Sequence, residues 1–80
     1  MKRSDLDTVT VLRLIDGRSD NWREWTSDYL ARQLPGVPPK VILAKLEQLA
    51  GQDLVEYGVT IRGCWLTAAG RQMLAGDAPT

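Results

Sequence analysis

The sequence predicts a small α+β domain in which three helices are followed by a two-stranded hairpin and a last helix. Three observations lead to this order. A Pro/Gly-rich turn at residues 34–39 separates two segments with helical periodicity. Two β-rich segments at 54–57 and 62–66 then flank a glycine-containing loop. Thr67 precedes a final short helical pattern that we expect to extend to residue 74 or 75.

The length of 80 residues and the hydrophobic content of 44% fit one compact domain, with an ordered part at about residues 5–75. A chain of this size buries only about 60–65% of its unfolded surface, so its stability should be modest. We therefore expect a single domain that gains stability by forming a dimer.

The first helix is expected at residues 6–15, before the stop signal Asp16-Gly17. Ser4 followed by the acidic Asp7 three positions later is close to a capping box. Residues 8–11 are β-branched at all four positions, so a strand is the alternative. We prefer the helix because the caps fit and an N-terminal strand would have no obvious partner.

Two tryptophans, Trp22 and Trp25, lie in the polar connection at residues 16–25. We expect both indoles to fold back over the core, because buried aromatic rings contribute a large apolar area. An exposed binding surface is the alternative, although large exposed apolar patches are uncommon on monomers.

The second helix is expected at residues 28–34, with Thr26 or Ser27 as its cap. Asp28 then lies in the first turn, where the helix dipole favours a negative charge. In the turn that follows, Gly36 permits a positive φ and the prolines prevent the helix from continuing.

The third helix is expected to run from about Pro39 to Ala50, with Gly51 as its C-terminal stop. Ile42, Leu46 and Leu49 fall within about 60° of one another on a helical wheel, which predicts a buried ridge. The residues on the opposite arc, which would face outward, are Lys40, Leu43, Ala44 and Glu47. Val41 and Gln48 lie at the edges of this arc.

This order of elements resembles the winged helix-turn-helix domains of bacterial, archaeal and phage regulators, of the MarR, ArsR and phage-repressor-like kinds. The resemblance covers about residues 5–75. It implies a three-helix core, a two-stranded wing, a short C-terminal helix, and a short strand at Trp25-Thr26. Asp53 stands where the family pattern usually has Gly, a departure that Asp tolerates in turns. The motifs that carry the resemblance are Leu30-Ala31, Leu46 with Leu49, Asp53-Leu54-Val55-Glu56, and Leu66-Thr67-Ala68-Ala69-Gly70.

The resemblance implies double-stranded DNA as the partner, with the third helix in the major groove and the wing along the backbone. We expect Lys40 and Arg62, the latter at the wing tip, to make the main phosphate contacts. Backbone amides at Ser27 could also donate to a phosphate. Leu43 and Ala44 could touch thymine methyl groups. Further cations around this face are Lys45, Arg32 and the arm Lys2-Arg3.

The charge balance favours an alternative, a protein–protein interaction module without sequence-specific DNA binding. Ten basic and ten acidic residues give a net charge of zero and a pI near 6.1, without the excess typical of nucleic-acid binders. In this alternative, Leu43 and Trp65 would contact the partner. Trp65 should point outward if Leu66 points inward, and the indole would then either anchor a partner or pack over the hairpin.

One cysteine and no histidine exclude an internal disulfide and a Cys/His metal cluster. The usual nucleophile and base pairs are also missing, so we expect neither an enzyme nor a cofactor. Cys64 should be a small apolar residue within a strand. Without an apolar run of about 20 residues or a signal peptide, we expect a cytoplasmic regulator of phage or bacterial type. The compact chain argues against a small-molecule sensor.

Overall fold

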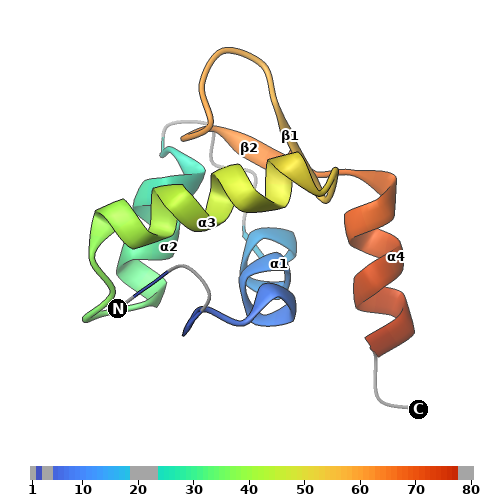
Figure 1. The fold of residues 1–80 in the computed structure, drawn as a ribbon, viewed down its shortest axis with the longest axis horizontal. Coiled ribbons are helices and arrows are strands. Elements are labelled where there is room, and N and C mark those ends of the chain that lie inside the picture. Colours follow the sequence, from blue (N-terminus) through green and yellow to red (C-terminus); the bar gives the residue numbers. More distant parts are fainter. Residues whose placement is uncertain (1, 3–4, 19–23, 78–80) are drawn as a thin grey trace.

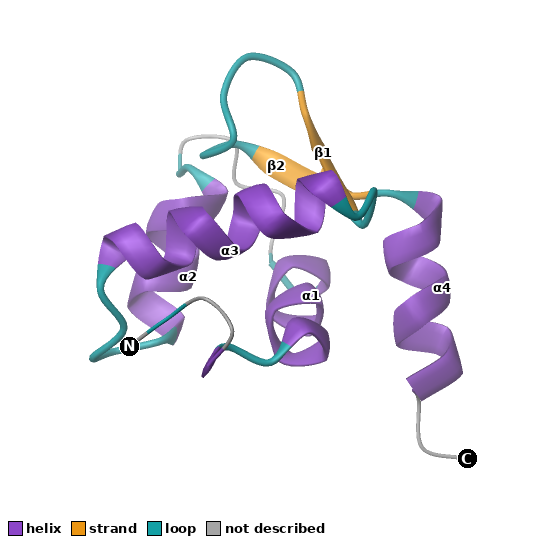
Figure 2. Cartoon of the chain, viewed as in Figure 1, coloured by secondary structure: helices purple, strands orange, loops and turns teal. Residues whose placement is uncertain are grey.

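The computed structural model describes residues 2, 5–18 and 24–77. These residues form four helices and a two-stranded antiparallel sheet, which confirms the predicted order of elements (Figures 1 and 2). The elements are α1 (Thr8–Asp16), α2 (Thr26–Gln33), α3 (Pro39–Gly51), β1 (Val55–Tyr57), β2 (Cys64–Leu66) and α4 (Ala68–Asp77).

Helix α3 crosses the front of the molecule in Figure 1, with α2 behind it, the hairpin above it and α4 to one side. Contacts join α2 to α3 and α4 to α1. The hairpin pairs Val55 with Leu66, Glu56 with Trp65 and Tyr57 with Cys64. Among the described residues, the buried core consists of apolar side chains from α1, α2, α3, the hairpin and the segments that precede α1 and β1: Leu6, Val11, Leu12, Ile15, Leu30, Val41, Ile42, Leu46, Leu49, Leu54, Val55, Cys64 and Leu66.

Helix α1 is a helix, as preferred from the sequence, but it begins at Thr8 rather than at residue 6. Its cap is Asp7, whose carboxylate accepts from the Thr10 amide at 3.0 Å and from the Thr10 hydroxyl at 2.9 Å. These bonds lower the pKa of Asp7. The predicted capping role of Ser4, which lies outside the described residues, was therefore wrong. Asp7 is the N-cap because its carboxylate accepts a hydrogen bond from an amide in the first turn of α1.

Helix α2 begins at Thr26, with Trp25 as an N-cap that makes no side-chain capping bond. The predicted cap at Thr26 or Ser27 and the predicted strand at Trp25-Thr26 were therefore wrong. The Thr26 hydroxyl instead donates to the Cys64 carbonyl at 2.7 Å, and the Ser27 amide donates to the Arg62 carbonyl at 3.0 Å. The first turn of α2 thus supplies donors to the carbonyl of the buried Cys64 in β2 and to the carbonyl of Arg62 in the segment that precedes β2.

Of the two tryptophans in the connection, Trp25 belongs to the described residues and Trp22 lies outside them. Trp25 remains 47% exposed, so it does not fold into the core as expected. Its ring covers Gly63, where an added Cβ would lie 2.6 Å from a ring carbon. The indole therefore packs on the backbone of the hairpin loop, which a side chain at position 63 would prevent.

Helix α3 starts at Pro39, as predicted, after a turn in which Gly36 has a φ of 89°. After Gly51 the chain turns through Asp53, whose φ is 63°. The Leu54 amide donates to the Leu49 carbonyl at 2.9 Å, and the Asp53 amide donates to the Ala50 carbonyl at 3.1 Å. These are the two bonds of a Schellman motif, in which Asp53 takes the left-handed position that glycine usually fills.

Thr67 caps α4, as predicted, and joins it to the end of α3. Its hydroxyl accepts from the Gly70 amide at 3.0 Å and donates to the Asp53 carbonyl at 2.6 Å. A Cβ at Gly70 would overlap the Leu54 carbonyl oxygen, so only glycine lets α4 approach so closely. Helix α4 continues to Asp77, past the predicted end. In the described part of the chain, no helix combines the length and apolar character needed to cross a membrane.

Candidate nucleic-acid interface

The outward face of α3 is the surface that the sequence nominated for DNA. The ridge of Ile42, Leu46 and Leu49 is buried, which confirms the predicted orientation of the helix. On the opposite side, Lys40 and Glu47 are exposed, and Leu43 and Ala44 are half-buried. Of the two residues expected at the edges, Gln48 is half-buried and Val41 is buried.

Lys45 does not belong to this surface, although the sequence assigned it to DNA binding. Its side chain is only 4% exposed. Its ammonium group donates to the Thr8 hydroxyl at 2.9 Å and stands close enough to Asp7 to help lower that carboxyl's pKa. The Lys45 ammonium group therefore interacts with residues at the start of α1 rather than facing solvent. A helical wheel places this lysine about 40° from Leu49, which was a signal that it borders the core.

Ser27 is likewise not available to a phosphate. The side chain is buried, and its amide already donates to the Arg62 carbonyl. The expectation that Ser27 offers an amide at an open helix N-terminus was therefore wrong. The reason is that the chain leading into β2 covers the start of α2.

Arg32 is exposed, but its charge is balanced by Glu24. Its Nε and Nη2 atoms donate to the two carboxylate oxygens of Glu24 at 2.7 and 2.6 Å. This bidentate pair raises the pKa of Arg32 and lowers the pKa of Glu24, because each charge stabilises the other. The guanidinium also lies 5.9 Å from the centre of the Tyr29 ring.

Lys40 and Arg62, the two residues expected to make the main phosphate contacts, both stay open to solvent. Both side chains are exposed, and neither forms an ion pair or a side-chain hydrogen bond within the described part of the chain. Arg62 is not at the tip of the hairpin loop, as expected from the sequence. Val59, which is 96% exposed, occupies the outer loop, and Arg62 lies where the loop returns to the start of α2. Of the cationic arm, Lys2 is exposed and Arg3 lies outside the described residues.

A groove separates the C-terminal half of α3 from the hairpin loop. The helix contributes the exposed side chain of Glu47, and the hairpin contributes the exposed side chains of Tyr57, at the end of β1, and Val59, in the loop. The groove has one acidic side chain and no basic one. Its lining residues are Glu47, Ala50, Gly51, Tyr57, Val59, Thr60 and Ile61.

Trp65 points away from the core, as the alternation of β2 predicts, and is 47% exposed. Its indole N–H donates to a carboxylate oxygen of Glu56, the residue opposite it on β1, at 2.8 Å. The ring also reaches Gly58, where an added Cβ would lie 3.8 Å from it. The indole therefore packs along the outer side of the hairpin while keeping an open face.

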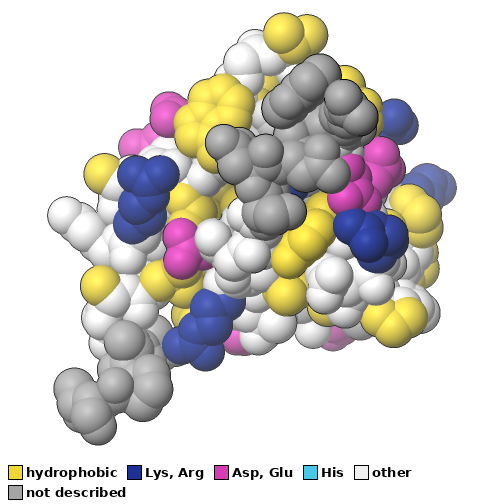
Figure 3. All heavy atoms as spheres, turned by 180° about the vertical axis from the view of Figure 1, so that it is seen from behind, with side chains coloured by type: hydrophobic (Ala, Val, Ile, Leu, Met, Phe, Trp, Pro, Cys, Tyr) yellow, Lys and Arg dark blue, Asp and Glu magenta, His cyan; other side chains and the backbone are white. Residues whose placement is uncertain are grey.

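The side of the molecule turned away from α3 shows no basic stripe among its described, visible side chains. In Figure 3, lysine and arginine side chains stand in separate places, with acidic and apolar side chains between them. The surface potential there is consequently mixed rather than one-sided.

Comparisons with protein-family models, with curated proteins and with solved structures find no match to this chain.

Proposed function

We propose that this chain is a small winged-helix protein that binds double-stranded DNA as a cytoplasmic transcriptional regulator of phage or bacterial type. In this assignment α2 and α3 form the helix-turn-helix, and the β1–β2 hairpin is the wing. The order helix, helix, helix, hairpin, helix and the buried ridge of α3 support it, because they leave the other face of α3 outward.

The observation that carries the proposal is a pair of exposed cations, Lys40 and Arg62, that have no ion pair or side-chain hydrogen bond among the described residues. Lys40 lies in the first turn of α3, and Arg62 lies in the hairpin loop, so the two elements that would approach DNA each hold one. Two other candidate cations near these elements already have partners: the buried Lys45 donates to Thr8, and the exposed Arg32 is paired with Glu24. Phosphate contacts therefore centre on Lys40 and Arg62.

The chemistry of the face predicts weak, backbone-led binding. Leu43 and Ala44 can approach thymine methyl groups, but the exposed arc lacks the arginine or asparagine side chains that read purine edges best. Glu47 adds a negative charge that repels phosphate. We therefore expect a dissociation constant of about 10⁻⁴–10⁻⁶ M, the range of binding dominated by the backbone.

The test is fluorescence anisotropy with a labelled 20-base-pair duplex at several salt concentrations. Lys40→Glu combined with Arg62→Glu should weaken binding at least about tenfold and flatten the salt dependence by about two ions. Arg71→Glu with Arg13→Glu is the matched control, because it makes the same change of charge at exposed cations on α4 and α1, outside α3 and the hairpin. Glu47→Gln should tighten binding. Equal loss in the two double variants would refute the assignment of the face.

A protein partner is the second candidate, favoured by the apolar loop of the hairpin. Val59 is almost fully exposed, and Tyr57 is half-exposed beside the groove that Glu47 lines. An exposed apolar patch of this kind would suit an interface. The sequence nominated Leu43 and Trp65, whereas the exposed surface extends to Tyr57 and Val59.

The DNA-binding and protein-binding functions can be distinguished by the salt dependence of binding and by which substitutions abolish it. A partner contact through this surface should survive 0.5 M salt and should be lost in Val59→Asp, Leu43→Asp or Trp65→Ala, whereas duplex binding should vanish at that salt. Loss of duplex binding only in the Lys40/Arg62 variant would favour DNA. Salt-tolerant capture that ignores Lys40 and Arg62 but needs Val59 would favour the protein partner.

A further inference from the structure

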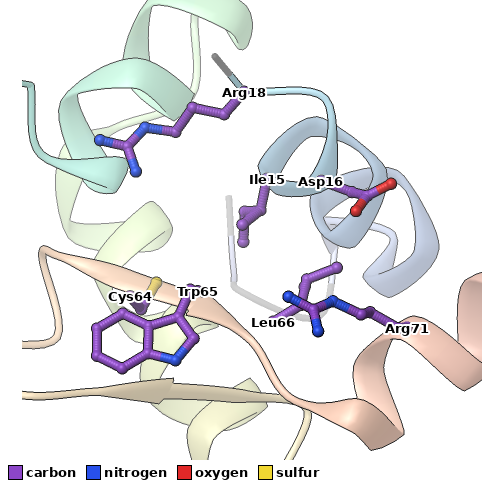
Figure 4. Close-up of a pocket in the computed structure, with 7 residues that line it drawn as sticks. All are labelled: Ile15, Asp16, Arg18, Cys64, Trp65, Leu66 and Arg71. Atoms are coloured by element: carbon purple, nitrogen blue, oxygen red, sulfur yellow. The ribbon is translucent and has the colours of Figure 1, made fainter. Parts of the chain in front are cut away.

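A second hollow lies between the end of α1, strand β2 and α4, and it shares no residue with the proposed DNA face. Its volume is about 270 Å³, near the lower end of the range for small-ligand sites. In Figure 4, Ile15 and Leu66 point toward one another and Arg71 extends toward them from α4, whereas Asp16 and Arg18 extend outward. The lining residues are Ile15, Asp16, Arg18, Cys64, Trp65, Leu66 and Arg71.

The floor of this hollow is apolar. Ile15, Cys64 and Leu66 are core residues. Burial raises the pKa of the Cys64 thiol to about 11, so the sulfur is present as a neutral thiol near pH 7. Trp65 adds the edge of a flat aromatic ring, whose polar N–H is directed to Glu56 on the hairpin. A flat apolar group would therefore find contacts on several sides.

The charge at the rim is positive. Two arginines and one aspartate line the hollow, which gives a formal balance of plus one. Arg18 donates to the Thr26 hydroxyl at 3.1 Å and to the Glu24 carbonyl, so its guanidinium is held toward α2. Arg71 is exposed and has no ion pair within the described part of the chain. In Figure 4 its guanidinium extends from α4 past Leu66 toward the hollow.

We propose that this hollow binds a small monocarboxylate with a flat apolar body, with the carboxylate on Arg71 and the apolar body between Ile15, Leu66 and Trp65. The Arg71 guanidinium has no ion pair among the described residues, and such a group can donate two parallel hydrogen bonds to a carboxylate. The apolar floor selects against small hydrated anions, which would gain nothing from it. Asp16, exposed at the rim, opposes the ligand's charge and limits the affinity.

Benzoate is the probe, followed by the indole N–H signal of Trp65 in a two-dimensional ¹⁵N NMR spectrum, assigned with Trp65→Phe. We expect a saturable shift of this signal, with a dissociation constant of about 1 mM. Arg71→Gln should weaken binding about tenfold or more. Asp16→Asn should tighten it about twofold or more, because it removes a like charge. Arg62→Gln, a matched loss of charge outside the hollow, should leave the titration unchanged.

Benzamide and acetate separate the two halves of the recognition. Benzamide keeps the ring without the charge, and acetate keeps the charge without the ring, so each should bind several-fold more weakly than benzoate. A titration without saturation up to 20 mM, an equal response to benzamide, or an unchanged affinity in Arg71→Gln would each overturn the proposal. The spectra of the variants also report that they are folded, and none of these results depends on DNA binding.

Discussion

On one side of α3, Ile42, Leu46 and Leu49 are almost completely buried, whereas on the other side Lys40 and Glu47 face solvent. The two sides differ in how strongly neighbours determine them. The inner side is fixed by contacts with the rest of the core. The outer side has one cation, one anion and two small or half-buried apolar residues, Ala44 and Leu43.

The comparison teaches that the same helix defines the fold far more sharply than the function. Any apolar residue of similar size would serve on the inner side, and its burial identifies it. The outer side can be interpreted only together with its surroundings. Lys45 shows this most directly, since it is as basic as Lys40 yet contributes its charge to the start of α1.

The largest expected effect compares one substitution on the two sides. Leu46→Ala should lower the free energy of unfolding by about 2–5 kcal/mol, because it leaves a cavity in the core. Leu43→Ala, on the half-buried outer flank, should cost less than about 1 kcal/mol. Urea denaturation followed by circular dichroism measures both. Similar losses at the two positions would show that α3 is rotated from the orientation described above.

Charge reversal at the two lysines should sharpen the comparison. Lys45→Glu should destabilise the fold by about 2 kcal/mol or more, because it places a carboxylate in a buried position near Asp7. Lys40→Glu should change stability by less than about 0.5 kcal/mol and weaken duplex binding instead. Denaturation and anisotropy on the same samples separate the two effects. If Lys40→Glu destabilised the fold and Lys45→Glu weakened only duplex binding, the assignment of Lys45 to the core and Lys40 to the surface would be wrong.

A smaller effect is expected just beyond α3, at Asp53. Asp53→Gly should stabilise the protein by up to about 1 kcal/mol, because glycine adopts a φ of 63° without strain. Asp53→Val should destabilise it by about 1–2 kcal/mol. Thermal unfolding of the pair is a sufficient measurement. If both variants were neutral, the left-handed turn at the end of α3 would not be present in solution.

The smallest effect concerns pH. The pKa of Asp7 lies below its ordinary value of 3.8, mainly because of the hydrogen bond from the Thr10 side chain. Its ionised form therefore stabilises the folded state above about pH 4, and this contribution is lost as the pH falls through the folded pKa. Lys45→Met should raise the Asp7 pKa measured by NMR, and Lys40→Met should not. Equal shifts would contradict the inward placement of Lys45.

The order of elements and the ridge of α3 were predictable because both depend on local signals. Proline at the start of α3, the glycine of the preceding turn and a 3.6-residue period act over a few positions. The inward position of Lys45 was also within reach, since the wheel that identified the ridge places it beside Leu49. The sequence prediction treated every lysine near α3 as a surface charge and so missed it.

The remaining site features depend on contacts that no local pattern contains. The Ser27 amide and the Thr26 hydroxyl donate to carbonyl groups 35 and 38 positions further along the chain. The charge of Arg32 is neutralised by Glu24 on the preceding connection. The hollow beside Arg71 needs three elements to meet, so the expectation of a chain without a ligand cavity could not anticipate it.

The hydrogen bonds from the first turn of α2 to the chain around β2 also affect how copies of this protein could associate. They cover acceptors on one border of the two-stranded sheet, so an additional strand from another molecule could not pair there without displacing α2. The opposite border is only three residues long and contains the charged Glu56. Short, charged borders resist accidental strand addition, and this sheet is therefore guarded against aggregation on both sides.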